Sequence, residues 1–343
     1  MRIALDAMGT DRHPVVEVEG AVQALETLPG DFEVILIGPR GRIEEELEAY
    51  PGARRDRIRI VDTAQRIDQG ESPAAAVRRK PGSSIVVGLT LVKEGDADAF
   101  VSAGSTGAAM AASHLLLRPL DGVDRPPVAT LLPTAREPVV LVDAGANVDS
   151  KPRHLVQFAR LGAIYARDVL GRPNPRVGLL NIGEEPEKGN ELALEAHRLL
   201  AMSGLNFVGN IEGRDIVPGD CDVVVADGFV GNVLLKFYES IAAYFTGLLK
   251  RELERSGEKL DLSEVYAALD YTEYGGAPLL GVNGIPIICH GGSPPRAICN
   301  AIGVAIRAVE IDLVGQMRRE LTASPAPGGD AIGPAVGRMA EGA

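Results

Sequence analysis

The sequence predicts an α/β fold in which a mostly parallel, doubly wound sheet lies between two layers of helices. Short apolar runs typical of buried strands alternate with longer segments of helical periodicity from the first residue to about residue 320. No internal repeat or linker interrupts this alternation. The pattern is typical of three-layer α/β/α proteins. We therefore expect one such domain over residues 1–321 and a disordered tail, rich in alanine, glycine and proline, over residues 322–343.

The individual elements follow from the apolar period and from the glycine and proline residues that bound it. Strands are expected at residues 2–5, 32–38, 57–62, 97–102, 128–132, 138–143, 177–182, 206–211, 222–226, 276–282 and 286–289. Helices are expected at residues 15–28, 44–50, 84–94, 108–117, 154–170, 192–200, 231–254 and 295–320. In doubly wound sheets, ligands bind beyond the carboxyl ends of the strands. Polar, glycine-containing loops are expected on that rim at residues 6–11, 102–107, 143–147, 181–190, 227–232 and 290–293.

Composition excludes several classes of protein. The net charge is −12, from 35 basic and 47 acidic residues, and would repel a nucleic acid backbone. Tryptophan is absent and aromatic residues make up only 4%, which disfavours surfaces that stack on bases. Three cysteines without paired spacing, and a first strand that starts at once, indicate a cytoplasmic protein without a signal peptide.

Common catalytic motifs are missing. The chain has no G-x-S-x-G elbow, no G-x-G-x-x-G after its first strand and no phosphate-binding P-loop. It also has neither H-E-x-x-H nor a cysteine and histidine cluster. We therefore expect no metal and no cofactor, and a site that binds an anion rather than one built on a protein nucleophile.

The loop that contains Lys188 is the first candidate for that site. It joins an apolar strand to an amphipathic helix, and Lys188 is its one cation, beside Glu184, Glu185 and Glu187. A strand, a glycine loop and a helix start bring backbone N–H groups and the positive end of a helix dipole to one place. The alternative is a solvated acidic loop in which Lys188 only balances the glutamates.

Asn232 and His290 are further candidates on the same rim. Asn232 lies in the first turn expected for the helix over residues 231–254, where an asparagine either caps the helix or reaches a ligand. His290 follows a strand and is the histidine best placed for acid–base chemistry. The alternative for His290 is a hydrogen bond to the loop backbone.

The same helix carries a sustained apolar stripe, followed by basic residues and a second amphipathic run. We expect a protruding helical hairpin over about residues 231–272. Core packing or a dimer interface suits its first half. For the distal half, an apolar stripe beside basic residues indicates contact with an anionic membrane surface. The residues expected to make that contact are Leu248, Leu249, Leu253, Leu262 and Val265.

Several segments resemble one bacterial family, the phosphate acyltransferases of phospholipid synthesis. The matching motifs occur in order between residue 1 and about residue 320. Thr10 and Ser105 stand where the family usually has glycine and asparagine. The matching segments are Asp6-Ala-Met-Gly9, Ser102-Ala-Gly, Thr106-Gly-Ala, Asp143-Ala-Gly-Ala-Asn-Val-Asp149, Leu180-Asn-Ile-Gly-Glu-Glu, Lys188-Gly-Asn-Glu-Leu192, Phe207-Val-Gly-Asn-Ile-Glu-Gly213, Asp227-Gly-Phe, Gly231-Asn-Val-Leu-Leu-Lys236 and Gly275-Gly-Ala-Pro-Leu-Leu-Gly281.

The resemblance implies transfer of a fatty acyl group from acyl carrier protein to inorganic phosphate. It implies a fold like that of phosphate acetyltransferases and isocitrate dehydrogenases, and a homodimer bound peripherally to the inner face of the cell membrane. The acyl-phosphate product would serve a membrane glycerol-3-phosphate acyltransferase. The essential lysine and asparagine of the family correspond to Lys188 and Asn232.

We expect phosphate to attack the thioester directly, without an acyl-enzyme, because phosphate is already an anionic nucleophile. Candidate carrier-protein docking patches are the basic runs at residues 78–80 and 250–259. Three alternatives stay open: a short-chain phosphate acyltransferase that uses acyl-CoA, a metal-dependent decarboxylating dehydrogenase, and a non-catalytic carrier-protein scaffold docked on the membrane. The residues expected to bind phosphate or substrate are Asp6, Gly9, Ser102, Gly104, Ser105, Thr106, Gly107, Asp143, Asn147, Asn181 and His290.

Overall fold

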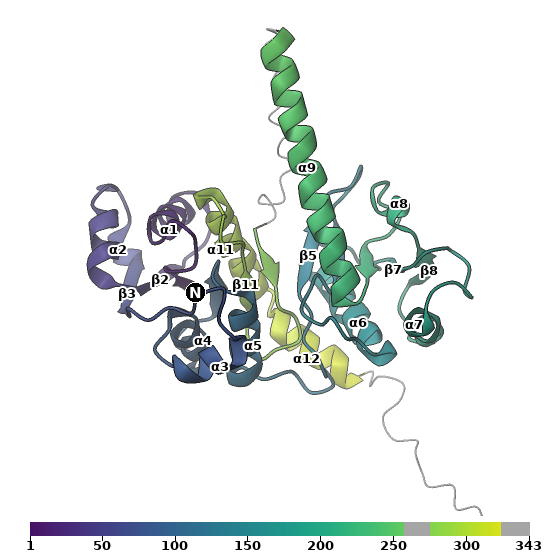
Figure 1. The fold of residues 1–343 in the computed structure, drawn as a ribbon. Helices are drawn as coiled ribbons and strands as arrows, with labels where there is room; N and C mark the ends of the chain where they lie inside the picture. Colours follow the sequence, from purple (N-terminus) through teal and green to yellow (C-terminus); the bar gives the residue numbers. More distant parts are fainter. Residues whose placement is uncertain (257–274, 324–343) are drawn as a thin grey trace, which may run out of the picture.

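The computed structural model describes residues 1–256 and 275–323, whose strands form two sheets (Figure 1). The six-stranded sheet has the order β10-β11-β4-β1-β2-β3, and all its pairs are parallel except β10 with β11. Its strands are β1 (Arg2–Asp6), β2 (Glu33–Gly38), β3 (Ile58–Asp62), β4 (Ala99–Ser102), β10 (Ala277–Pro278) and β11 (Pro286–Ile288).

The five-stranded sheet has the order β5-β6-β9-β7-β8, and only β5 with β6 is antiparallel. Its strands are β5 (Ala129–Leu132), β6 (Val139–Val142), β7 (Val177–Leu180), β8 (Phe207–Ile211) and β9 (Val223–Val225). The antiparallel edge strands of the two sheets meet, because Val128 and Leu279 form a bridge between them. The backbone N–H of Leu280 also donates to the carbonyl of Pro127.

Helices cover both faces of the sheets. In β1, Ile3 and Leu5 point into one apolar cluster and Ala4 into another; Val140 and Leu141 of β6 divide between the same two clusters. Each cluster therefore runs across both sheets, as expected for strands buried on both faces. The helices are α1 (Val15–Thr27), α2 (Arg40–Leu47), α3 (Pro73–Arg79), α4 (Ser84–Glu94), α5 (Thr106–Leu116), α6 (Pro152–Asp168), α7 (Glu191–Ala201), α8 (Gly213–Ile216), α9 (Gly228–Ser256), α11 (Pro295–Glu310) and α12 (Leu313–Ala323), with the 3-10 turn η1 (Arg55–Arg57).

These elements confirm the mostly parallel α/β fold. The strands divide between two sheets, and the edge strands β5 and β10 run antiparallel to their neighbours. Apolar periodicity encodes neither feature. The helix expected over residues 295–320 breaks into α11 and α12 around Asp312, which has a positive φ of 53°. Thr322 and Ala323, expected in the tail, belong to α12.

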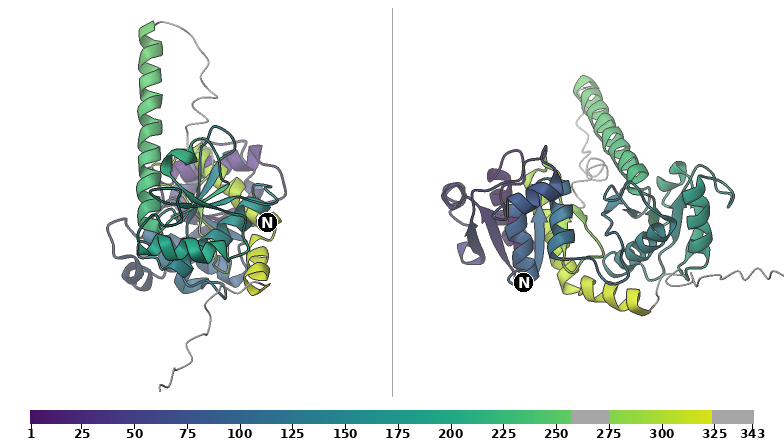
Figure 2. Two further views of the ribbon diagram at one scale, coloured as in Figure 1. Left: turned by 90° about the vertical axis from the view of Figure 1, so that its right-hand side faces the viewer. Right: turned by 60° about the horizontal axis from the view of Figure 1, so that its bottom comes forward.

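Helix α9 rises from the junction of the two sheets and projects beyond the rest of the protein (Figures 1 and 2). It starts at Gly228 and ends at Ser256, so its first turns touch the body and its distal turns do not pack on it. Within residues 1–256 and 275–323, no helix is long and apolar enough to cross a membrane. The second half of the expected hairpin, with Leu262 and Val265, and residues 324–343 lie outside the described residues.

Candidate active site

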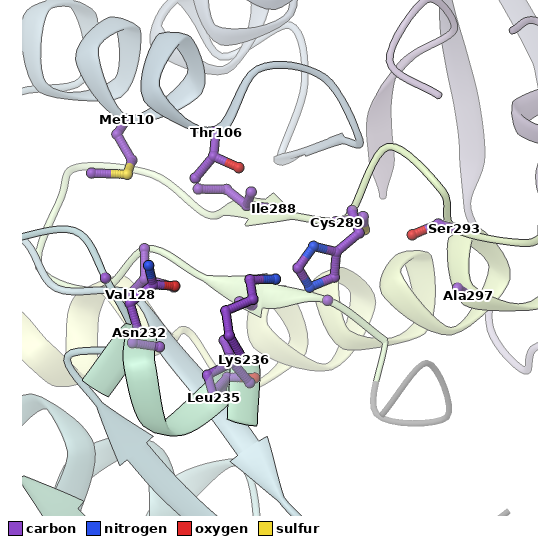
Figure 3. Close-up of a pocket in the computed structure, with 16 residues that line it drawn as sticks. Thr106, Met110, Val128, Asn232, Leu235, Lys236, Ile288, Cys289, Ser293 and Ala297 are labelled. Atoms are coloured by element: carbon purple, nitrogen blue, oxygen red, sulfur yellow. The ribbon is translucent and has the colours of Figure 1, made fainter. Parts of the chain in front are cut away.

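A pocket of about 330 Å³ opens where the two sheets meet (Figure 3). Loops and helices after four parallel strands, β4, β6, β9 and β11, line it. One part of the lining is polar and the other is apolar. The polar side chains are Thr106, Thr130, Asn232, Lys236, His290 and Ser293, and the apolar ones include Met110, Val128, Leu235, Ile288 and Ala297.

Asn232 lies in the second turn of α9 and does not cap the helix. The capping position is taken by Asp227, whose Oδ1 accepts hydrogen bonds from the backbone N–H groups of Phe229 and Val230. Gly231 brings the helix close to the loop after β6, since a Cβ atom there would lie 1.9 Å from the carbonyl oxygen of Asp143. The Asn232 side chain is therefore available to the pocket, into which it points (Figure 3).

Asp143, which directly follows β6, holds the loop after this strand in place by hydrogen bonds. Its buried carboxylate accepts hydrogen bonds from the backbone N–H groups of Val128, Gly145, Ala146 and Asn147. The Asn147 amide also donates to it. Burial raises the pKa of Asp143, and these hydrogen bonds oppose that rise. Asp143 and Asn147 thus fix the loop, whose Ala144 and Gly145 line the pocket.

Asp6, the last residue of β1, supports the loop after β4 in a similar way. Its Oδ2 accepts a hydrogen bond of 2.7 Å from the Ser102 hydroxyl, which in turn accepts from the N–H of Gly104. Gly9 packs against the backbone of Ala103 and Gly104. Burial also raises the pKa of Asp6, against its hydrogen bonds. These residues support the loop rather than line the pocket.

The loop after β4 ends at the start of α5. Ser105 caps this helix by accepting from the N–H of Ala108 at 3.4 Å, and Thr106 lines the pocket. A second hollow of about 470 Å³, lined by Gly104, Ser105 and Gly107 among others, adjoins the first and shares Thr106, Cys289 and His290 with it. Backbone N–H groups at such a helix start suit an anion.

Lys236 and Glu239 are site residues that sequence reasoning missed. Lys236 follows Asn232 by one helical turn, so the i, i+4 spacing was the available signal. Its Nζ lies 2.8 Å from Glu239 Oε2, and Glu239 Oε1 lies 3.2 Å from His290 Nε2. Lys236 is thus the cation that lines the pocket in this chain.

Cys289 is the one side chain in the pocket lining that could act as a thiol nucleophile. It is buried, and burial, together with the nearby carboxylate of Glu17, raises its pKa to about 12. Thiols at neutral pH react as thiolates, so this environment keeps Cys289 unreactive. Among the described residues, no group of three or more His, Cys, Asp and Glu side chains is placed to hold a metal.

Lys188 lies apart from this pocket, on the exposed loop after β7. Asn181 spans that loop by donating from Nδ2 to the Lys188 carbonyl at 2.9 Å. The loop borders a different hollow, whose lining includes Val230 of α9. Residues two apart on a helix point to nearly opposite sides, so Val230 and Asn232 face different hollows. Within one chain, Lys188 therefore does not line the pocket that Asn232 lines.

Residues 1–316 match a family described as "Fatty acid synthesis protein". A phosphate acyltransferase of Desulforamulus reducens is 49% identical over 328 residues, which cover 94% of this chain and 97% of the relative. One from Desulfitobacterium hafniense (strain DSM 10664 / DCB-2) is 51% identical over 330 residues, covering 94% and 98%. One from Moorella thermoacetica is 51% identical over 323 residues, covering 92% and 94%.

Solved structures of two phosphotransacetylases share the fold. One, from Streptococcus pyogenes, superposes with a TM-score of 0.61 at 19% identity, covering 90% of this chain and 94% of the other. The EutD phosphotransacetylase from Staphylococcus aureus gives 0.60 at 17%, covering 91% and 94%. At 17% and 19% identity, the two solved structures show the fold alone. The relatives at about half identity show the family. The chain belongs to the fatty acid synthesis protein family, and within it to the phosphate acyltransferases.

Proposed function

We propose that the enzyme transfers a fatty acyl group from acyl carrier protein to inorganic phosphate in the pocket between the two sheets. The observation that carries this proposal is the two-part lining of the pocket. Thr106, Asn232 and Lys236 offer hydrogen bonds and positive charge for phosphate. Met110, Val128 and their apolar neighbours offer a surface for the acyl chain.

In this mechanism, a phosphate oxygen attacks the thioester carbonyl carbon. A carbon–oxygen bond forms, the carbon–sulfur bond breaks, and its electron pair leaves on the carrier's sulfur, which takes up a proton. The raised pKa of Cys289 supports direct attack over an acyl-enzyme. Besides its hydrogen bond to phosphate, Asn232 is assigned to the oxyanion that develops on the carbonyl, where one preorganised donor contributes roughly 3–4 kcal/mol. The start of α5 is assigned to phosphate.

Lys188 stays in the proposal as a catalytic residue supplied by a second copy of the chain. An exposed apolar surface surrounds its loop: Ile182 is 81% exposed and Phe229 63%. This surface continues along the first turns of α9 through Val233 and Phe237. Pairing these surfaces in a homodimer would bury them and would bring each Lys188 toward the partner's pocket.

The distal turns of α9 are assigned to the inner face of the cell membrane. Ile241, Tyr244, Phe245 and Leu248 form an exposed apolar stripe on the projecting part of the helix. Leu249 and Leu253 lie on the same turns and are partly buried. Contact there would place the site near a membrane glycerol-3-phosphate acyltransferase, which would consume the acyl-phosphate.

The donor is tested by offering palmitoyl-acyl carrier protein and palmitoyl-CoA in parallel with phosphate. The acyl-phosphate formed is trapped with hydroxylamine. We expect a much higher kcat/KM with the carrier protein. Equal or better use of acyl-CoA contradicts the donor assignment, and carrier-protein binding without any product contradicts catalysis.

Membrane contact is tested by flotation with anionic phosphatidylglycerol vesicles. We expect the Leu248→Glu/Leu249→Glu variant to lose flotation, since charge on the stripe opposes insertion. Leu194→Glu, at an exposed apolar position of α7, is the matched control and should float like the wild type. Equal flotation of all three proteins contradicts the assignment.

A further inference from the structure

A carboxylate lies between two basic side chains at the wall of the pocket. Glu239 Oε2 accepts a hydrogen bond from Lys236 Nζ at 2.8 Å. Glu239 Oε1 is buried and makes no hydrogen bond of good geometry, and His290 Nε2 lies 3.2 Å from it. The Glu239 side chain is 16% exposed, whereas Lys236 and His290 are 51% and 45% exposed. The acid is therefore the buried centre of the group.

Glu239 is ionised in this setting. Burial acts to raise its pKa, but the contacts with His290 and Lys236 outweigh burial, so the pKa is lowered. A fixed negative charge so close to an anion site repels phosphate through space. A carboxylate in this place is favourable to phosphate binding only if it holds groups that attract the anion more strongly.

Lys236 is the group that Glu239 holds and that can attract the anion. It lies one turn beyond Asn232 on the same face of α9, and both line the pocket. Its amine points into the open space between α9 and the end of β11 (Figure 3). A free lysine side chain has many rotamers, and ordering it costs entropy each time it binds a ligand. The Glu239 contact orders it in advance.

We propose that Lys236 is the phosphate-binding cation that this chain contributes to its own pocket, and that Glu239 is the positioning residue that holds it there. This inference rests on the proposed placement of phosphate in the pocket. It gives the two lysines different roles: Lys236 binds phosphate in its own chain, and Lys188 comes from the second copy. An exposed i, i+3 ion pair with no further role would contribute little.

The test measures KM for phosphate and kcat with acyl-carrier protein and with acyl-CoA, alongside calorimetric binding of inorganic phosphate without a donor. We expect Lys236→Gln to raise KM for phosphate about 10- to 100-fold, the usual effect of losing a charge-assisted hydrogen bond. Lys236→Arg should keep most of the affinity. Glu239→Gln should weaken phosphate binding about 5- to 10-fold, with a smaller change in kcat.

The double variant separates positioning from a structural role. In a Lys236→Gln background, Glu239→Gln should add less than about twofold, since its effect passes through Lys236. Glu44→Gln, which breaks the exposed pair with Arg40 on α2, is the matched control and should bind phosphate like the wild type. Unchanged or tighter phosphate binding by Glu239→Gln overturns the positioning role, and an unchanged KM in Lys236→Gln overturns the whole inference. Donor preference of the wild type tests the proposed function separately.

Discussion

The loops after β6 and β7 leave the same sheet, and each begins with a polar residue and has a glycine two positions later, yet the loops differ in their surroundings. After β6, the buried Asp143 carboxylate gathers four backbone N–H groups, and the loop lines the pocket. After β7, the amide of Asn181 spans a loop that is largely exposed, and Lys188 does not line the pocket of Asn232. A buried acid at the strand end therefore marks the loop that is fixed against the pocket.

Helix α9 is the reason that the two loops are separated. Its first turns lie between them, with Val230 on the side of the β7 loop and Asn232 on the side of the pocket. If both loops serve one reaction, the second copy has to join them.

The largest effect is expected at the two candidate catalytic side chains. Asn232→Ala and Lys188→Ala should each lower turnover by about 10²- to 10³-fold, as for loss of a preorganised donor to a developing charge. Circular dichroism should show both variants folded. Near-normal turnover of either variant removes that residue from the mechanism.

Co-expressing the two variants with different tags tests whether Lys188 acts across a dimer. A purified mixed dimer holds one complete site if Lys188 serves the partner's pocket, and should show about half of the wild-type rate. It holds none if Lys188 acts within its own chain. An inactive mixed dimer, or failure to recover one, contradicts the two-copy site.

The two loops should also differ in how much they contribute to the free energy of unfolding. Asp143→Asn replaces an acceptor oxygen with an amide beside the N–H of Asn147, so we expect a loss of about 2–5 kcal/mol in the free energy of unfolding. Asn181→Ala removes a partly exposed hydrogen bond and should cost about 1 kcal/mol. Urea unfolding measures both. Equal costs would show that burial of the strand-end acid does not distinguish the loops.

A pH-dependent effect is expected at Glu17, which holds the loop after β1. Its buried carboxyl accepts from the N–H and hydroxyl of Thr10, and burial raises its pKa from 4.5 to about 7. Between these pH values the folded state keeps a proton that the unfolded state releases. The free energy of unfolding should therefore fall by about 3 kcal/mol as pH rises from 4.5 to 7. Glu17→Gln should flatten that slope in urea titrations, and an unchanged slope contradicts the assignment.

The smallest effect is expected at Cys289, although it lines the pocket. Because its thiol stays protonated, Cys289→Ala should keep kcat within about twofold. Phosphate-dependent product formation is the readout. A loss of several orders of magnitude, or an acyl group recovered on the protein, would instead indicate an acyl-enzyme at this residue.

The sequence predicted the parallel α/β fold, because apolar runs and helical periods report burial directly. It did not predict two sheets, since the sheet to which a strand belongs depends on pairing between segments far apart in the chain, such as β4 with β11. Asn232, Thr106 and His290 were predicted and do line the pocket. Lys236 was missed as a site residue because a lysine on an amphipathic helix looks like solvated surface until the neighbouring β11 loop is placed beside it.

Locating a bound anion shows whether phosphate occupies the pocket between the two sheets. Crystals soaked in arsenate, a phosphate analogue, locate the anion through the anomalous scattering of arsenic. We expect a peak within hydrogen-bond reach of Thr106, Asn232 and Lys236, in the pocket between the sheets. A peak found only at the loop of residues 181–190 would contradict that placement and would return the anion to Lys188 of the same chain.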